Sequence, residues 1–386
     1  MRVGIIGAGQ LARMMLEDAS ALGIAVSVLA DSPEDGAALT CTDVIIGAAT
    51  AEVGVRELAR RSDVLTLDHE LVDLELLERL EDEGVVVHPP TTALRYAVDK
   101  AAMRRRLGAA GLPMPGHTTI EPDEEADVAH IGEVLGWPLV IKAATGGYDG
   151  RGVFVVEDLE AAEATLRDLK AAGITALVEE AVAIHHELAA LVARRADGQL
   201  VAWPVVETAQ IDGVCREVVL PGVLDARLCA EAESIARRVA EEVGVVGVMA
   251  VELFATADGL VINELAMRPH NSGHWTQDGS VTSQFANHLR AVLGLPLGAT
   301  DPIAPAVASV NVFGGDQPVD LDAALHDALA EPSAHVHLYG KSPRPGRKLG
   351  HVTVVGDDGG AVRAAAWAAA IALGTPVPPE MEVENR

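Results

Sequence analysis

Residues 146–152 read GGYDGRG and combine reactive side chains with unusual backbone freedom. Glycine costs up to roughly 1 kcal/mol of backbone entropy against alanine, so four glycines in seven positions need a reason. The apolar runs WPLVIK and VFVVED flank them, which predicts a strand, a glycine loop and a second strand that act as a flap. Amides of such a loop suit phosphate oxygens, and Lys142 ends the first strand. A plain hairpin is the alternative, but it needs no Tyr148, Asp149 and Arg151.

The glycine loop does not match a Walker phosphate-binding loop. A Walker loop leads from a strand into a helix and carries Lys-Ser/Thr after its last glycine. Here Arg151 follows the third glycine, and an apolar strand follows the loop. The sequence therefore predicts a hairpin flap that closes over a ligand.

Two glutamates are expected to face each other on a hairpin over 249–266, MAVELFATADGLVINELA. A turn around 257–259 places Glu252 opposite Glu264 within a residue of register. Like charges directly opposite each other destabilise a sheet, whereas Mg²⁺ binds one or two carboxylates together with substrate phosphates. Asn263 offers a further oxygen ligand. We therefore predict Mg²⁺ at Glu252 and Glu264, with two exposed acids on one rim as the alternative.

Two more polar segments have the composition of ligand-binding loops. RPHNSGHWTQ at 268–277 packs polar side chains between apolar segments, and such loops typically contact polar ligands. YGKSPRPGRKLGH at 339–351 is strongly basic. Its fixed positive charges are Lys341, Arg344, Arg347 and Lys348. In a chain of net charge −28 this cluster favours a small anion such as a sugar phosphate. The alternatives are a solvated connection and a solvated basic turn.

The elements that position these loops fall into three parts of an α/β chain. Strands at 2–6, 25–30, VIIG, VLTLD and VVVHP alternate with helices up to residue 90, which predicts a parallel sheet. GAGQLA at 7–12, with Asp31 after the next strand, matches the dinucleotide fingerprint in outline. NAD or FAD binding, a site for another phosphate and a purely structural turn all fit it.

The remaining two thirds of the chain show longer strand pairs and several helices. Expected helices span 99–111, 158–172, 225–243 and 360–373. Prolines 302 and 305 indicate a linker over 299–305. Short strands, VASVNVFG, HVHLYG and HVTVVG, follow it and predict a small β-rich C-terminal unit.

Composition excludes several classes of function. With 49% hydrophobic residues the chain is globular, and its net charge of −28 disfavours duplex nucleic acid and anionic membranes. Three cysteines without CxxC spacing suggest neither a disulfide framework nor a zinc site. No signal peptide and no run of about 18 apolar residues is evident, so we expect a cytoplasmic protein.

Several segments together resemble the ATP-grasp superfamily and, within it, the N5-carboxyaminoimidazole ribonucleotide synthetases of purine biosynthesis. They are GAGQLARMM, GGYDGRG, VELF…DGLVINELAMRPHNSGHWT, SQFANHLRAVLGLPLG and YGK…RPGRKLGHV, in one order from residue 3 to about 353. The resemblance implies a Rossmann-like pre-ATP-grasp domain at 1–90. A two-lobed ATP-grasp domain at 91–298 and a small C-terminal β-rich domain at 299–386 would follow.

The same resemblance implies the reaction and its partners. ATP and bicarbonate would form carboxyphosphate, which carboxylates the amine of 5-aminoimidazole ribonucleotide in de novo purine biosynthesis. Mg²⁺ would be the cofactor, and a homodimer that hands its product to a downstream mutase is expected. The alternatives are another ATP-grasp carboxylate–amine ligase, a nucleotide-sensing module without catalysis, and an NAD(P)-dependent oxidoreductase.

Roles carry over position by position from the resemblance. ATP-binding residues would be Lys100, Lys142, Gly147, Tyr148, Asp149, Gly150, Arg151, Gly152, Val153, Glu179, Glu180, Ala181, Val182, Glu187, Gln210, Asn263 and Glu264. Substrate-binding residues would be Gln10, Leu11, Glu70, His270, Asn271, Ser272, Lys341, Arg347 and Lys348. Catalytic residues would be Tyr148, Asp149, Arg151 and Arg268, and the metal ligands Glu252 and Glu264.

The chain departs from the family pattern at three positions. Asp68 stands where a glutamate is common, and Gln210 where a histidine is usual. Lys100 replaces an arginine, which keeps the charge and loses the planar fork. The role of Asp68 is therefore left open by the sequence.

Overall fold

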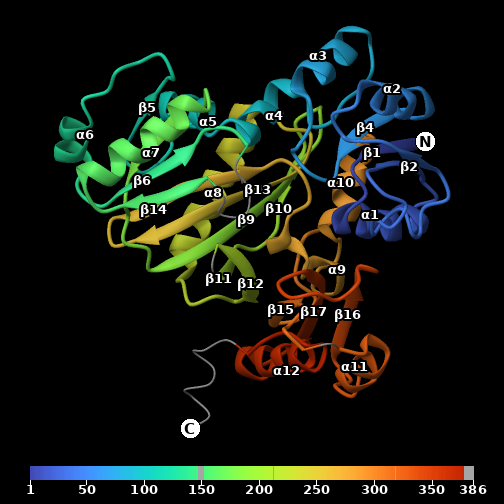
Figure 1. The fold of residues 1–386 in the computed structure, drawn as a ribbon. Helices are drawn as coiled ribbons and strands as arrows, with labels where there is room; N and C mark the ends of the chain where they lie inside the picture. The colour runs from blue at the N-terminus through green and yellow to red at the C-terminus, as the bar shows by residue number, and fades with distance from the viewer. Residues whose placement is uncertain (147–151, 212, 318, 378–386) are drawn as a thin grey trace.

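Three β-sheets and the helices that cover them make up the described part of the protein. The computed structural model describes residues 1–146, 152–211, 213–317 and 319–377. In Figure 1 the N-terminal parallel sheet lies at the right and a small antiparallel sheet at the left. A long sheet runs between them and continues into the C-terminal strands at the bottom.

The N-terminal unit is the parallel sheet that strand–helix alternation predicted. Its elements are β1 (Arg2–Ile6), α1 (Gln10–Ala21), β2 (Ala25–Ala30), β3 (Val44–Ile46), α2 (Glu52–Arg61), β4 (Val64–Leu67) and α3 (Leu74–Asp82). The strand order is β3-β2-β1-β4, with every neighbouring pair parallel. Apolar side chains of β1, including the fully buried Ile5 and Ile6, fill the space beneath the helices.

The fifth strand predicted at VVVHP is wrong. Only an isolated parallel bridge joins Leu65 to Val87, with the Leu65 amide donating to the Val86 carbonyl at 2.9 Å. The next positions are Pro89 and Pro90, which have no N–H with which to continue a ladder.

The glycine turn after β1 is closed by an acid of this chain. The Asp68 carboxylate accepts hydrogen bonds from the amides of Gly9 and Ala12, each at 2.7 Å. A Cβ at Gly9 would lie 2.5 Å from Asp68 Oδ2, so only glycine allows this approach. The amides that a dinucleotide pyrophosphate would need at the start of α1 are thus already bound to a carboxylate. Asp68 therefore closes the GAGQLA turn at the start of α1.

Asp68→Ala is expected to destabilise the protein by about 2–3 kcal/mol, because two amides lose a charged, buried acceptor. Asp73 is a matched control, since its carboxylate caps α3 through the Leu76 amide alone, at 3.0 Å. Asp73→Ala should therefore cost only about 1 kcal/mol. Urea-unfolding curves compare the two. A loss for Asp68→Ala no larger than that for Asp73→Ala would contradict this account of the turn.

The small antiparallel sheet and its helices follow. They comprise α4 (Thr91–Val98), α5 (Lys100–Ala109), β5 (His117–Ile120), α6 (Val128–Leu135), β6 (Leu139–Ala143), β7 (Val153–Val156), α7 (Leu159–Ala171) and β8 (Ala176–Glu180), in the strand order β5-β8-β6-β7. The expected hairpin around GGYDGRG is confirmed, because β6 pairs antiparallel with β7 and Lys142 lies opposite Val153. The loop tip that joins them, 147–151, lies outside the described residues.

The helix predicted at 99–111 begins one residue later and ends at Ala109. Asp99 has an extended backbone and caps α5, with its carboxylate 2.9 Å from the Ala102 amide. It also ends α4, a helix that the sequence analysis did not predict. Capping by Asp99 makes Lys100 the first residue of α5.

The long sheet carries the acidic hairpin. Its elements are β9 (His186–Arg194), β10 (Leu200–Ala202), β11 (Val206–Ile211), β12 (Val214–Leu220), α8 (Ala226–Val243), β13 (Gly247–Thr256) and β14 (Gly259–Ala266), followed by η1 (Asn271–Gly273), α9 (Thr276–Gly279) and α10 (Gln284–Val292). The strand order begins β14-β13-β9-β11-β12, with β10 beside β9. Helix α8 packs its apolar face, Ile235 and Val239 included, into the core beneath β13 and β14.

The C-terminal strands extend this sheet. The elements are β15 (Ala306–Phe313), α11 (Leu321–Ala328), β16 (Ala334–Leu338), β17 (Lys348–Gly356) and α12 (Gly359–Ala372). Strand β15 pairs with β12, and β17 and β16 follow it in the sheet. The segment 299–305 therefore joins two parts of one sheet. Among the described residues no helix is long and apolar enough to cross a membrane.

Candidate active site

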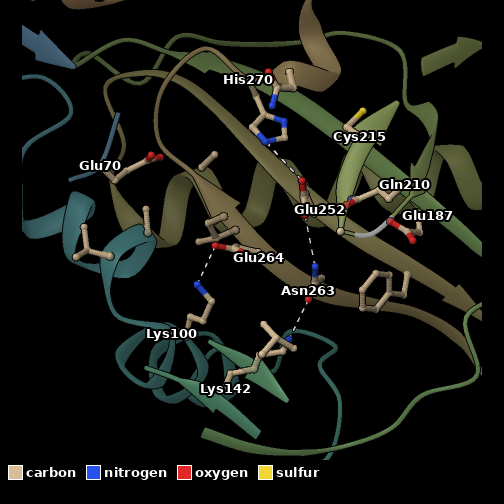
Figure 2. A pocket seen from close by; sticks show the side chains of 18 of the residues that line it. Glu70, Lys100, Lys142, Glu187, Gln210, Cys215, Glu252, Asn263, Glu264 and His270 are labelled. Atoms are coloured by element: carbon tan, nitrogen blue, oxygen red, sulfur yellow. Dashed lines mark hydrogen bonds and ion pairs between the residues drawn. The ribbon is translucent and has the colours of Figure 1, made fainter. Parts of the chain in front are cut away.

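A cavity of about 840 Å³ opens between the small sheet and the long sheet (Figure 2). Most of the described residues that were predicted for the site line it. They are Gln10, Leu11, Glu70, Lys100, Lys142, Val153, Glu179, Glu180, Ala181, Val182, Glu187, Gln210, Glu252, Asn263, Glu264, Arg268, His270 and Asn271. Gly152, Ser272, Lys341, Arg347 and Lys348 are not among the lining residues, and Gly147, Tyr148, Asp149, Gly150 and Arg151 fall outside the described ones.

The two glutamates of the acidic hairpin lie directly opposite each other. Glu252 on β13 pairs in register with Glu264 on β14, as predicted. The register shifts after this pair, so Leu253 lies opposite Ile262 and Asn263 has no partner. Such a bulge breaks the in–out alternation of the strand. Asn263 and Glu264 consequently both reach the cavity, although they are neighbours in sequence (Figure 2).

Electrostatics at this pair favour a bound cation. Desolvation, followed by the charges of Glu264 and Glu187, raises the pKa of Glu252 to about 7. The Asn263 amide donates to Glu252 Oε2 at 3.4 Å, which offsets little of that repulsion. Facing carboxylates with a neutral oxygen beside them form the donor set of a hard divalent cation. Glu252, Glu264 and Asn263 therefore fit Mg²⁺.

Two lysines approach the hairpin from the small-sheet side. Lys100 donates to Glu264 Oε1 at 2.9 Å, and Lys142 donates to Asn263 Oδ1 at 3.1 Å (Figure 2). Lys142 also forms an ion pair with Glu179 at 2.7 Å. Both ammonium groups are largely buried yet remain at the cavity wall. They supply point charges where a polyphosphate beside the acids would lie.

Arg104 supports the site from behind the cavity wall, and it was not predicted from the sequence. Its side chain is fully buried and donates to Glu179 Oε1 at 2.5 Å. It also donates to the carbonyls of Ile262 and Asn263, at 2.9 and 3.0 Å. One guanidinium thus holds both the β14 bulge and the acid that orients Lys142. Arg104 lies four residues after Lys100, on the same face of the helix, and this spacing could have indicated that it lies close to the site.

Glu179 is held as an anion by these two cations. Burial raises its pKa, but the charges of Arg104 and Lys142 outweigh that effect and lower the pKa overall. The Glu179 side chain faces the two cations, so a contact between this segment and an adenine base would come from the backbone of 179–182. The predicted role of that segment in reading adenine stays a prediction.

Glu187 is a further acid of the cavity wall, and it is paired with Gln210. Burial raises the pKa of Glu187, and a hydrogen bond from Gln210 partly opposes the rise. The strand pairing of β11 shifts between Ala209 and Gln210. Glu187 and Gln210 lie side by side at the cavity wall in Figure 2.

Glu70 positions Arg268. Arg268 Nε donates to Glu70 Oε2 at 2.5 Å, and the Met267 amide donates to Glu70 Oε1 at 3.2 Å. The carboxylate therefore fixes both the side chain and the backbone at the end of β14. Arg268 presents a positive charge to the cavity close to His270.

His270 is a neutral ring between the acids and the polar run. Its Nδ1 accepts from the Ser272 amide at 3.4 Å, and its Nε2 lies 3.5 Å from Glu252 Oε1. Burial, with the charges of Arg268 and Lys348, lowers the pKa of His270 to about 3. The Nε2 edge of the ring therefore faces Glu252. Ser272 is buried beneath this ring and supports it.

The basic C-terminal loop touches the rim of the cavity through two lysines. Lys341 donates to Gln10 Oε1 at 2.8 Å, and Lys348 donates to Asn271 Oδ1 at 2.7 Å. Arg347 bonds within the loop, to the Ser342 carbonyl at 3.3 Å. The cavity therefore combines acids suited to a metal with cations from two directions, the lysines of the small-sheet side and those of the C-terminal loop. Such an arrangement suits two anionic substrates.

Family models match the chain in the same three parts. A ribonucleotide synthetase preATP-grasp domain matches residues 1–98, and an ATP-grasp domain matches 105–285. A phosphoribosylaminoimidazole carboxylase C-terminal domain matches 307–365.

Individual relatives agree with these models. An N5-carboxyaminoimidazole ribonucleotide synthase of Mycobacterium tuberculosis is 49% identical over 361 residues, covering 92% of this chain and 84% of the relative. The Corynebacterium ammoniagenes enzyme of the same name is 41% identical over 94% of this chain and 89% of the relative. A solved synthase from Aspergillus clavatus, in complex with ADP and 5-aminoimidazole ribonucleotide, has a TM-score of 0.86 at 33% identity. The match covers 96% of this chain and 98% of that one.

Proposed function

The chain belongs to the N5-carboxyaminoimidazole ribonucleotide synthases of the ATP-grasp superfamily, and on that premise we propose how its residues divide the reaction. It is an ATP-dependent ligase of purine biosynthesis. The observation that carries the assignment of the centre is the Glu252–Glu264 pair, which faces Lys100 and Lys142 across the cavity.

ATP binds with its phosphates over the acidic hairpin. Lys100 and Lys142 contact the phosphates, and the flap 146–152 closes over them. The backbone of 179–182 reads the adenine, and Glu187 with Gln210 binds near the ribose. Mg²⁺ held by Glu252, Glu264 and Asn263 supplies charge stabilisation at the phosphates when bound.

Bicarbonate binds beside Arg268, whose charge and position Glu70 maintains. A bicarbonate oxygen attacks the γ-phosphorus of ATP, and ADP leaves to give carboxyphosphate. The amine of 5-aminoimidazole ribonucleotide then attacks the carboxyl carbon. Inorganic phosphate departs and the nitrogen loses a proton, which leaves the N-carboxylated ribonucleotide. Tyr148, Asp149 and Arg151 of the flap complete this second site and exclude water.

Release of ADP tests this division of work. We expect ADP to form only when bicarbonate and 5-aminoimidazole ribonucleotide are both present. The carbon of ¹³C-bicarbonate should appear in the carboxyl group on the product nitrogen. ADP release with another amine instead would favour a different ATP-grasp ligase. Absence of turnover with every amine would favour a nucleotide-sensing module.

The basic loop is proposed to bind the phosphate of the ribonucleotide. Lys341→Met removes a cation at the rim, so KM for the ribonucleotide should rise about 10–100-fold, the value of a charge-assisted hydrogen bond. KM for ATP should stay unchanged. Arg167→Met is the control, because Arg167 is an exposed cation on α7 that does not line the cavity. Initial rates at varied concentrations of the ribonucleotide and of ATP give both KM values. A rise in KM for ATP alone would contradict the assignment.

Three further proposals rest on the family resemblance alone. The protein acts in the cytoplasm, it forms a homodimer, and it hands its unstable product to a downstream mutase.

A further inference from the structure

A cluster of histidines and acids lies outside the cavity, where three parts of the chain meet. Among the described residues, Asp278, His337 and His351 each offer a ligand atom, and these atoms lie within 4.8 Å of one another. Asp278 belongs to α9, His337 to β16 and His351 to β17. Figure 1 shows α9 directly above the ends of the C-terminal strands. None of the three residues lines the active-site cavity.

His351 contributes a buried nitrogen that lacks a partner. The residue is fully buried, and its Nδ1 lies 2.8 Å from the Tyr339 hydroxyl. Its Nε2 is buried and has no hydrogen-bond partner. Buried polar atoms are rarely left unpaired, because each such atom costs about 1–3 kcal/mol. An imidazole nitrogen of this kind, next to a second histidine and a carboxylate, is able to bind a ligand.

Each of the three groups is also supported on its other polar atom. Tyr339 contacts His351 Nδ1, as above, and Glu17 of α1 has its Oε2 3.9 Å from His337 Nδ1. Asp278 Oδ1 lies 3.4 Å from His335 Nδ1, whereas its Oδ2 lies 2.8 Å from His337 Nε2. Metal-binding histidines typically donate their second ring nitrogen to a carboxylate or another oxygen acceptor in this way. Tyr339 supports His351 in this way, whereas Glu17 lies at ion-pair distance from His337.

We propose that Asp278, His337 and His351 bind one divalent transition-metal ion of the zinc class. Two imidazole nitrogens and one carboxylate oxygen suit Zn²⁺ or Co²⁺ better than Mg²⁺, which prefers oxygen ligands. Three protein ligands leave a fourth position for water. When the metal binds, the proton between His337 and Asp278 leaves, and Nε2 and Oδ2 turn to the ion. The His337 and His351 rings stack nearly parallel, with centroids 4.6 Å apart, so one ring must rotate before both nitrogens point at the same ion.

The position of the cluster gives the ion a structural task. It links α9 to β16 and β17, with Glu17 extending the contact to α1. The His351 ring stacks on His274 at 4.8 Å, and His274 Nε2 lies 3.4 Å from Lys348 Nζ. A bound ion would therefore fix the strand that begins with Lys348 against the polar run 268–277. This site is separate from the Glu252–Glu264 pair in both location and ligand chemistry.

Co²⁺ titration of the full-length, tag-free and chelator-treated protein tests the proposal. With excess MgADP present to occupy the active site, one equivalent of Co²⁺ should give a visible d–d absorption band, and Zn²⁺ should abolish it. His337→Gln and Asp278→Asn change half-buried side chains and should retain the fold. Each should weaken Co²⁺ binding on the order of 100-fold, and Glu17→Gln on the order of 10-fold.

Two controls separate this site from others. His326→Gln removes a histidine that is 89% exposed and distant from the cluster, so it should leave the Co²⁺ band unchanged. Glu252→Gln removes an active-site acid and should also leave the band unchanged. The proposal is overturned if wild-type protein gives no band. It is equally overturned if the band survives in His337→Gln and Asp278→Asn, or disappears in Glu252→Gln.

Discussion

Replacing Glu264 with glutamine is expected to lower kcat on the order of 10²–10³-fold while the protein stays folded. The substitution keeps the size of the side chain and removes the charge that faces Glu252 and pairs with Lys100 at 2.9 Å. Removal of one preorganised electrostatic group from a catalytic centre typically costs this much. The measurement is steady-state ADP release at saturating substrates, with circular dichroism to confirm the fold.

Glu231→Gln is the control for this substitution, since Glu231 is an exposed acid on α8 outside the cavity. It should leave kcat within about twofold, because solvated surface charges contribute little. Wild-type turnover in Glu264→Gln would mean that the acidic hairpin does not serve the phosphates.

Arg104→Met is expected to destabilise the protein by about 3–5 kcal/mol, because it leaves the buried Glu179 with an incomplete set of partners. The fully buried guanidinium also satisfies the Ile262 and Asn263 carbonyls, which would lose their donor. Urea unfolding measures the loss. Activity should fall as well, since the β14 bulge that carries Asn263 and Glu264 loses its support.

Two companion variants make the Arg104 prediction specific. Arg104→Lys keeps the charge and loses the fork, so it should recover only part of the stability. In a double-mutant cycle, Glu179→Gln should cost less in the Arg104→Met background than in wild type, because the buried charge has already lost its partner. Additive losses would show that the two residues act independently.

The sequence predicted the hairpins of the site well, because the cause of each is local. Short apolar strands around Asp258-Gly259 determine the register that places Glu252 opposite Glu264, and glycines mark the β6–β7 connection. The bulge at Asn263 was not predicted, and Arg104, which donates to the Ile262 carbonyl beside it, lies 158 residues away in the sequence. The three consecutive arginines at 104–106 are typical of a solvated helix face, whereas in the structure Arg104 is fully buried.

Long-range pairing also explains what was missed elsewhere. The carboxylate of Asp68 accepts a hydrogen bond from the Gly9 amide, 59 residues away in the sequence. Because the sequence does not reveal this contact, the glycine turn also fitted a dinucleotide-binding site. Likewise, β15 pairs with β12 and continues the central sheet, a strand pairing that the proline-containing segment at 299–305 does not reveal. The histidine cluster draws on α9, β16 and β17, and no spacing rule in the sequence connects them.

The most direct test is a crystal structure with Mn²⁺ and a non-hydrolysable ATP analogue, recorded with anomalous scattering from manganese. We expect an anomalous peak between the carboxylates of Glu252 and Glu264, in contact with the terminal phosphates, with Lys100 and Lys142 beside them. A triphosphate bound away from both acids, or manganese density elsewhere only, would contradict this assignment.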